Sequence, residues 1–151
     1  LYVSLSAPNE KLFKKIDRPL LKDGWQRLIK SMALIKTLKD KTRTVIRLTL
    51  IKNENMTLPE KYGKIIKMAN PTYLEVKAFA LMGASKQKYT KENTPTHEET
   101  KRFAIEVGKY CGYNIIDEQP VSRVILMMEK YRKDRIMNHE LLPKFKMMLP
   151  K

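Results

Sequence analysis

Three short segments of the chain alternate between apolar and polar residues, which is the pattern of half-buried β-strands. They cover residues 1–6, 43–51 and 73–79. In the second segment, for example, Ile46 belongs to the apolar set of positions and Arg47 to the polar set. The pattern predicts three strands, each with one face toward a core.

Four other segments repeat apolar residues every three or four positions, which predicts amphipathic helices. They begin at Asn9, Asp23, Pro59 and Thr96. Asparagine and aspartate cap helix N-termini well, and proline is tolerated in a first helical turn. Thr96 and Glu99 have the spacing of a capping box, and Gly112 is suited to end the helix that they open.

Two more strands are expected over residues 113–117 and 121–128. Because strands and helices alternate along the chain, their order predicts a parallel α/β sheet, either open or closed into a barrel. Strands covered by helices on both faces are apolar throughout, whereas the three clearest strands here each keep a polar face. This favours a sheet that lines a ligand cavity over a sheet with one solvated face.

Two charged residues belong to these polar faces. Lys77 shares a face with Glu75, and a partly desolvated lysine can form a Schiff base with a carbonyl compound. The alternative is a structural ion pair between Lys77 and Glu75. Arg47 is suited to bind a carboxylate or phosphate in bidentate fashion, or to form an ion pair of the same structural kind.

The composition is that of a folded domain with a strongly basic surface. Of the 151 residues, 42% are hydrophobic and 31% charged, and the net charge is +15. Such an excess predicts a polyanionic partner, with nucleic acid favoured over an anionic membrane surface. No apolar run of about 18 residues occurs, so we expect no membrane span.

A basic tail, residues 129–151, follows a domain of residues 1–128. The tail carries seven Lys or Arg and three acidic residues. Its cations are expected to contact the phosphates of a nucleic acid. The residues assigned to this role are Lys130, Arg132, Lys133, Arg135, Lys144 and Lys146.

Thiol and imidazole groups are scarce. The sequence has one cysteine, Cys111, and two histidines, His97 and His139, far apart along the chain. One thiol can form neither an internal disulfide nor a cysteine zinc site, and it cannot supply the several thiolates of an iron–sulfur cluster. We therefore expect no metal site within this chain.

Five stretches together resemble one enzyme family. They are the strand Tyr-Val-Ser-Leu-Ser-Ala-Pro (2–8), Asp-Arg-Pro (17–19), residues 41–51, residues 73–77 with 83–85, and Thr-His-Glu-Glu (96–99). In this order and spacing they resemble the radical S-adenosylmethionine enzymes that form the wyosine base of tRNA, the 4-demethylwyosine synthases of archaea and eukaryotes. The resemblance extends over about residues 2–128.

The resemblance implies a fold, a reaction and a cytoplasmic location. Residues 1–128 would be the C-terminal half of a partial (α/β)6 radical S-adenosylmethionine barrel. In the family, a 4Fe–4S cluster on a C-x-x-x-C-x-x-C loop reduces S-adenosylmethionine, and the resulting radical attacks the methyl group of 1-methylguanosine in phenylalanine tRNA. Pyruvate then donates two carbons. Ser4, Arg47 and Asn55, at or just after the ends of parallel strands, are expected near S-adenosylmethionine, and Lys77 near pyruvate.

The chain departs from the family pattern in two places. The cluster cysteines are absent, so we expect the first half of the barrel to precede Leu1 or to be a separate partner. Ser6 stands where the family usually has Asp, which removes any carboxylate role there. Two alternatives stay open: a non-catalytic basic RNA-binding domain, and a radical S-adenosylmethionine enzyme that acts on a peptide or small molecule.

Overall fold

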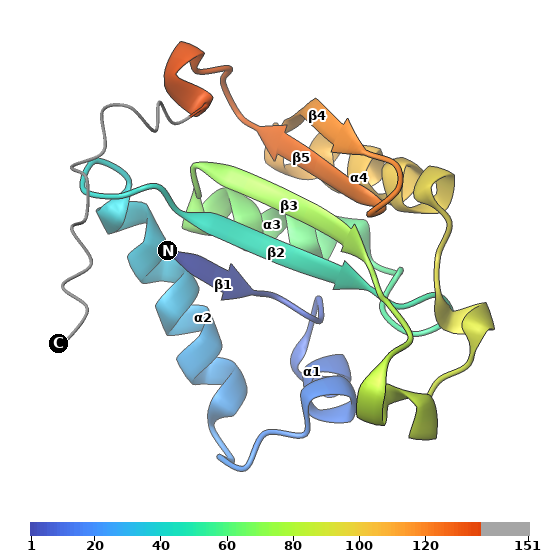
Figure 1. The fold of residues 1–151 in the computed structure, drawn as a ribbon. Helices are drawn as coiled ribbons and strands as arrows, with labels where there is room; N and C mark the ends of the chain where they lie inside the picture. The colour runs from blue at the N-terminus through green and yellow to red at the C-terminus, as the bar shows by residue number, and fades with distance from the viewer. Residues whose placement is uncertain (137–151) are drawn as a thin grey trace, which may run out of the picture.

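Five strands form one mixed sheet in the order β1-β2-β3-β5-β4 in the computed structural model, which describes residues 1–136 (Figure 1). The strands are β1 (Tyr2–Ser4), β2 (Val45–Leu50), β3 (Tyr73–Ala78), β4 (Asn114–Gln119) and β5 (Val124–Met128). Strands β1, β2 and β3 are parallel, whereas β5 is antiparallel to both of its neighbours. The expected parallel sheet is therefore right for the pairing of β1, β2 and β3 and wrong for β5, which pairs antiparallel with both β3 and β4.

The short connection between β4 and β5 explains this difference. Residues 120–123 join the two strands, with Arg123 in the left-handed region at a φ of 52°. A parallel pair needs a crossover of about a dozen residues or more, so a connection this short closes an antiparallel hairpin. Strand β5 then inserts between β3 and β4.

Four α-helices and four 3₁₀ turns complete the described chain. The helices are α1 (Glu10–Asp17), α2 (Gly24–Ile35), α3 (Pro59–Ala69) and α4 (His97–Cys111). The 3₁₀ turns are η1 (Lys36–Leu38), η2 (Gly83–Gln87), η3 (Lys91–Asn93) and η4 (Lys133–Arg135). None of the described helices combines the length and apolar character that a bilayer span requires.

Local capping signals set the N-termini of α1 and α4, whereas Asp23, expected to cap α2, makes no side-chain cap hydrogen bond. The Asn9 side chain accepts a hydrogen bond from the Leu12 backbone N–H at 3.0 Å, which opens α1. At α4, Thr96 Oγ1 accepts from Glu99 N at 3.1 Å and Thr96 N donates to Glu99 Oε2 at 2.8 Å. Gly112 ends α4 in the left-handed region, at a φ of 81°. The capping box and the terminal glycine are both confirmed.

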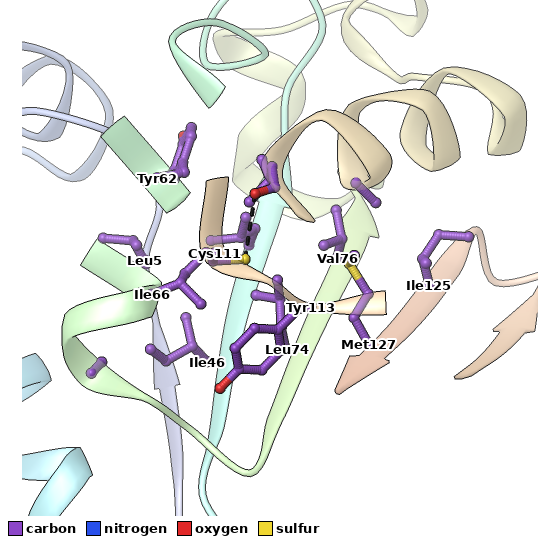
Figure 2. Packing of buried hydrophobic residues seen from close by; sticks show 14 of the residues in the cluster. Leu5, Ile46, Tyr62, Ile66, Leu74, Val76, Cys111, Tyr113, Ile125 and Met127 are labelled. Atoms are coloured by element: carbon purple, nitrogen blue, oxygen red, sulfur yellow. Dashed lines mark hydrogen bonds between the residues drawn. The ribbon is translucent and has the colours of Figure 1, made fainter. Parts of the chain in front are cut away.

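One face of the sheet carries the core. Helices α3 and α4 pack against each other behind β2 and β3, and α2 packs against α3 (Figure 1). From the strands, Ile46, Leu48 and Leu74 are fully buried in this layer. Helix residues such as Tyr62 and Ile66 meet them there (Figure 2). The predicted apolar faces of β2 and β3 are thus confirmed.

No described helix covers the opposite face of β1, β2 and β3, which we call the open face (Figure 1). By strand alternation it bears Tyr2 and Ser4 of β1, Arg47 of β2, and Glu75 and Lys77 of β3. The expectation that helices cover only one side of these strands holds for the described residues. The polar side chains of the candidate site all lie on this side.

Candidate functional site

Strand register places Ser4, Arg47 and Glu75 in one row across the open face. Ser4 is opposite Arg47, and Arg47 is opposite Glu75. The Arg47 guanidinium donates from Nε to Glu75 Oε1 at 2.7 Å and from Nη2 to Glu75 Oε2 at 3.4 Å. The structure thus brings two of the expected ligand-binding residues, Ser4 and Arg47, side by side. Arg47 lies in the middle of β2, however, not at its end as expected.

Tyr2 completes this polar row from the neighbouring position on β1. Its hydroxyl donates to Glu75 Oε2 at 3.0 Å, and its ring lies 5.0 Å from the Arg47 guanidinium carbon. Burial and the hydrogen bond to Glu75 raise the pKa of the Tyr2 phenol, while Arg47 opposes the shift. The Tyr2 hydroxyl therefore stays protonated at neutral pH and serves as a donor.

The Glu75 carboxylate is almost completely buried, at 7% exposure, and both of its oxygens are paired. Its hydrogen bond to Arg47 is the main cause that raises the pKa of the Arg47 guanidinium, which therefore stays a cation. The Arg47 side chain is 38% exposed, and a guanidinium has five N–H donors, of which Glu75 uses two. Arg47 can therefore hold Glu75 and still offer donors to an anionic ligand.

Lys77 lies one row further toward the carboxyl ends of the strands. Its register partners are Thr49 on β2 and Val124 on β5, and its side chain is partly buried. Among the described residues, no carboxylate lies within ion-pair distance of Lys77. The alternative reading, a Lys77–Glu75 ion pair, is wrong for this structure, because Glu75 pairs with Arg47 and Tyr2 instead.

Asn55 lies just beyond the carboxyl ends of β1 and β2. It is fully buried, and its side chain accepts from Ile51 N at 2.6 Å. The same amide donates to the carbonyl oxygens of Ser6 and Thr49, each at 2.8 Å. All of these groups belong to the chain itself, so the Asn55 side chain is engaged by the ends of the strands. It fixes the carboxyl end of β1 against that of β2.

Ser6 follows β1 at the same end of the sheet. Its hydroxyl donates to the Asp17 carboxylate at the end of α1. Its carbonyl accepts from the Tyr62 hydroxyl at 3.3 Å, and that hydroxyl also lies 3.2 Å from Asn55 O. Burial raises the pKa of the Tyr62 phenol strongly, so its hydroxyl stays protonated at neutral pH and acts as a hydrogen-bond donor. Although residue 6 is a serine and not an aspartate, the Asp17 carboxylate of α1 lies beside it.

A groove of about 610 Å³ lies at the opposite, amino ends of the strands. Its lining is mainly apolar and consists of Leu1, Tyr2, Thr42, Arg43, Val45, Tyr73, Leu126, Arg135 and Ile136. The groove adjoins the polar row through Tyr2, but Arg47, Glu75 and Lys77 are absent from its lining. We place the candidate site by its chemistry, at Arg47 and Lys77.

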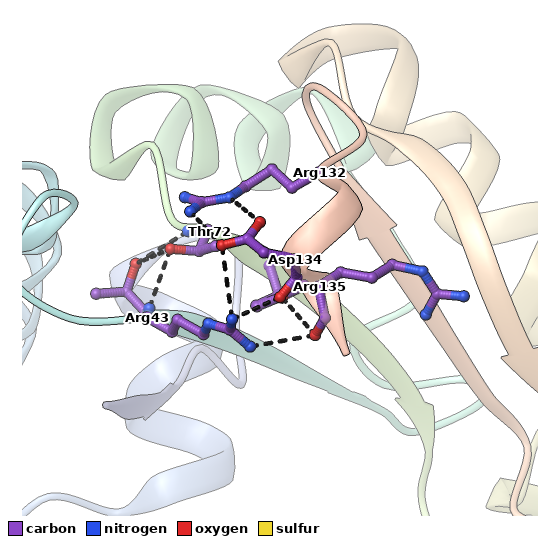
Figure 3. Close-up of polar contacts among 7 residues, drawn as sticks. Arg43, Thr72, Arg132, Asp134 and Arg135 are labelled. Atoms are coloured by element: carbon purple, nitrogen blue, oxygen red, sulfur yellow. Dashed lines mark hydrogen bonds and ion pairs between the residues drawn. The ribbon is translucent and has the colours of Figure 1, made fainter. Parts of the chain in front are cut away.

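The first part of the basic tail also lies at the amino ends (Figure 3). Arg132 donates to both carboxylate oxygens of Asp134, at 3.0 and 2.8 Å, and Arg135 pairs with Asp117 at 3.1 Å. Arg43 donates to the carbonyl oxygens of residues 134 and 135. Two of the expected phosphate-binding cations are therefore already paired. Lys144 and Lys146 lie outside the described residues.

Within residues 1–136, no three His, Cys, Asp or Glu side chains gather where a metal ion could bind. Cys111 is buried at the end of α4, and its thiol donates to the Val107 carbonyl at 3.4 Å (Figure 2). Burial is the main cause that raises the pKa of this thiol. The reactive thiolate is therefore scarce near neutral pH, which fits a packing role.

Burial should make Cys111 slow to react in the folded protein. At pH 8 we expect a disulfide reagent such as DTNB to label it on the order of 100-fold more slowly than in urea, since a raised pKa and lack of access both suppress attack. Absorbance of the released thiolate measures both rates. Equal rates with and without urea would contradict a buried, protonated thiol.

Comparison with known proteins identifies the chain's relatives. Residues 68–129 match the wyosine base formation family. The chain is 43% identical over 129 residues to the S-adenosyl-L-methionine-dependent tRNA 4-demethylwyosine synthase of Pyrococcus horikoshii, covering 85% of this chain and 37% of that enzyme. The human enzyme is 36% identical over 132 residues, which cover 86% of this chain and 18% of the human protein.

Solved structures agree with the sequence relatives. A structure of TYW1 with a lysine–pyruvate adduct bound has a TM-score of 0.73 at 27% identity, covering 85% of this chain and 40% of that one. A crystal structure of archaeal TYW1 has a TM-score of 0.65 at 25% identity, with coverage of 85% and 39%. The chain thus matches less than half the length of each of these proteins.

These matches indicate the class: residues 68–129, which include β3, α4, β4 and β5 of the mixed sheet, are similar to the wyosine base formation family. Over about 85% of its length it is homologous to the tRNA 4-demethylwyosine synthases. The family resemblance expected from the sequence is confirmed.

Proposed function

We propose that this chain is one part of a tRNA 4-demethylwyosine synthase, in which it forms the C-terminal half of a partial (α/β)6 barrel. The reaction would convert 1-methylguanosine of phenylalanine tRNA into the tricyclic base, with S-adenosylmethionine and pyruvate, in the cytoplasm. The observation that carries the proposal is a polar open face on three parallel strands of a chain homologous to these enzymes. The other half of the barrel would close over that face.

Arg47 and Ser4 are the residues that we propose beside S-adenosylmethionine. The unpaired N–H groups of Arg47 suit the carboxylate of the methionine part, and the neighbouring exposed Ser4 hydroxyl adds a donor or acceptor. Asn55 would act indirectly, because it fixes the ends of β1 and β2 through their carbonyl groups. Glu75 and Tyr2 hold the Arg47 guanidinium in place.

The residues described do not fit a 4Fe–4S cluster. Such a cluster needs several thiolates, and the sequence offers a single cysteine, which is buried at the end of α4. If the proposal is right, the cluster ligands come from outside this chain. The contribution of residues 1–136 is then to bind and orient S-adenosylmethionine, pyruvate and tRNA.

Lys77 is the residue that we propose in contact with pyruvate. Its ammonium has no described ion-pair partner, and it lies one row from Arg47 on the same face. As a neutral amine it would attack the keto carbon of pyruvate and lose water to form an imine. As an ammonium it would instead bind the pyruvate carboxylate. A relative has been solved with a lysine–pyruvate adduct bound, which supports testing the covalent form.

Borohydride trapping distinguishes these two roles of Lys77. The complete enzyme is incubated with labelled pyruvate, reduced and digested, and the labelled peptide is identified by mass spectrometry. We expect Lys77→Ala to remove the label from the peptide and to abolish turnover, whereas Lys67→Ala, an exposed lysine on α3, should change neither. Full labelling of Lys77→Ala would exclude the Schiff base. A raised KM for pyruvate in that variant would still support an electrostatic contact.

The cations of the tail are proposed as a second set of tRNA contacts. Lys130 and Lys133 are exposed, whereas Arg132 and Arg135 would first have to exchange their carboxylate partners for phosphates. Each phosphate contact releases counterions and makes binding weaker at high salt. Loss of the tail should therefore flatten the salt dependence of tRNA binding.

A further inference from the structure

The loop after β3, residues 79–95, is a structured basic element at the carboxyl ends of the parallel strands. Phe79 N donates to Leu50 O at 2.8 Å, so the loop leaves the sheet beside the end of β2. Lys52 N donates to Asn93 O at 2.9 Å, and Asn93 Nδ2 donates back to Lys52 O at 3.0 Å. The loop is therefore attached at both ends to the edge where Lys77 lies, and it contains the turns η2 and η3 (Figure 1).

An aromatic pair stands at the start of this loop. The rings of Phe79 and Tyr89 lie edge to face, with centroids 5.3 Å apart, and both residues are partly exposed. Phe79 directly follows β3, and its hydrogen bond to Leu50 O continues the ladder by one residue, so alternation from Lys77 puts it on the side of the open face. The Lys88 ammonium lies 4.9 Å from the centre of the Tyr89 ring. Aromatic rings beside a cation are the usual stacking platform for nucleic-acid bases.

The charge of the loop is almost unopposed. It carries three exposed lysines, Lys86, Lys88 and Lys91, and one acidic residue, Glu92. Among the described residues, none of the three lysines forms an ion pair. In contrast, Arg132 and Arg135 of the tail are paired and lie at the far end of the strands. The loop lysines therefore lie at the same edge of the sheet as Lys77 and are free of carboxylate partners among the described residues.

We propose that residues 79–95 form an RNA-binding surface that presents an unpaired base to the open face. Lys86, Lys88 and Lys91 would bind phosphates, and the exposed parts of Phe79 and Tyr89 would stack on the base. An acidic peptide would satisfy the lysines but not the aromatic pair, so the combination favours RNA. This inference rests on the proposed function, because it names how the tRNA reaches that same site.

Two triple variants with the same charge change test the surface. One replaces Lys86, Lys88 and Lys91 by Ala, and the other replaces Lys61, Lys64 and Lys67, which are exposed on α3. Binding of the full chain to an RNA stem–loop is measured by fluorescence anisotropy at several salt concentrations. For the loop variant we expect about 30-fold weaker binding at low salt and a salt slope smaller by about 2, since three phosphate contacts are lost. The α3 variant should stay within about threefold of the unmodified chain, because its lysines lie on the helix-covered side.

A second comparison tests the aromatic pair. Tyr89→Leu should weaken stem–loop binding by about tenfold and leave binding to a blunt RNA duplex with equal phosphates unchanged, since a duplex offers no free base. Equal losses in the two triple variants would overturn the proposal, as would a loop variant that binds normally. Thermal unfolding confirms that each variant is folded. These binding assays need no turnover, so they test the loop independently of the reaction. If the chain binds RNA through this loop but the complete enzyme makes no tricyclic base, only the proposed function is contradicted.

Discussion

Replacing Gly63 by leucine should be the most destabilising single change in the described core. Gly63 is buried in α3 where that helix crosses α4. A Cβ atom at this position would lie 2.4 Å from Tyr110 Cβ and 3.2 Å from the Tyr110 carbonyl carbon. Atoms this close cannot be relieved by rotating a side chain, so the two helices must move apart. Their separation would disturb the Tyr62–Phe103 contact, where the ring centroids are now 5.9 Å apart.

The expected loss in free energy of unfolding is about 3 kcal/mol or more, at the upper end of overpacking effects. The higher helix propensity of leucine relative to glycine offsets about 1 kcal/mol of the destabilisation that the clash causes. For a chain of this length the midpoint of thermal unfolding should fall by roughly 10 °C. Lys64→Leu, on the exposed side of the same helix, is the control and should stay within about 0.5 kcal/mol. A Gly63→Leu protein as stable as this control would disprove the close helix contact.

Asn55→Ala should cost about 3 kcal/mol, because the buried N–H of Ile51 and the carbonyl oxygens of Ser6 and Thr49 all lose a hydrogen-bond partner. The Ile51 N–H suffers most, since the Asn55 side chain is its acceptor at 2.6 Å. The Ser6 carbonyl keeps its contact with Tyr62. Urea unfolding followed by circular dichroism measures the change.

The same variant separates two roles for Asn55. A residue that only contacted a cofactor would leave stability unchanged when replaced by alanine and would lower cofactor affinity alone. The observed hydrogen bonds predict the opposite result: Asn55→Ala should lower the stability of the chain strongly even when no ligand is bound. Thr57→Ala, exposed in the same loop, is the matched control and should change stability by less than about 0.5 kcal/mol. An Asn55→Ala variant as stable as this control would refute the positioning role.

Much of the local structure could be predicted from the sequence, because its signals lie within a few residues of one another. The capping box of Thr96 and Glu99 and the terminal Gly112 mark both ends of α4. Alternation in β2 and β3 identified the apolar face that packs against the helices, since successive strand residues face opposite sides, although Val45, Tyr73 and Glu75 on the other face are buried as well. The polar character of the open face followed from the same alternation.

The tertiary structure decided which of those polar groups meet. Glu75 and Lys77 are close in sequence, but residues two apart on a strand are about 6.6 Å apart, whereas neighbouring strands are only about 4.8 Å apart. Glu75 therefore pairs with Arg47, which is 28 residues away along the chain. Sequence spacing cannot give this register, because it depends on how β2 and β3 align in the sheet.

The sequence by itself determined the elements, the apolar faces, the basic charge and the family resemblance of this chain. Only the tertiary structure decided that β5 runs antiparallel beside β3, that Asn55 is buried among carbonyl groups, and that Arg132 and Arg135 lie far from Lys77. The physical reason is common to all three. Each depends on contacts between segments distant in sequence, and such contacts are fixed by packing and hydrogen bonding of the whole sheet and not by local periodicity.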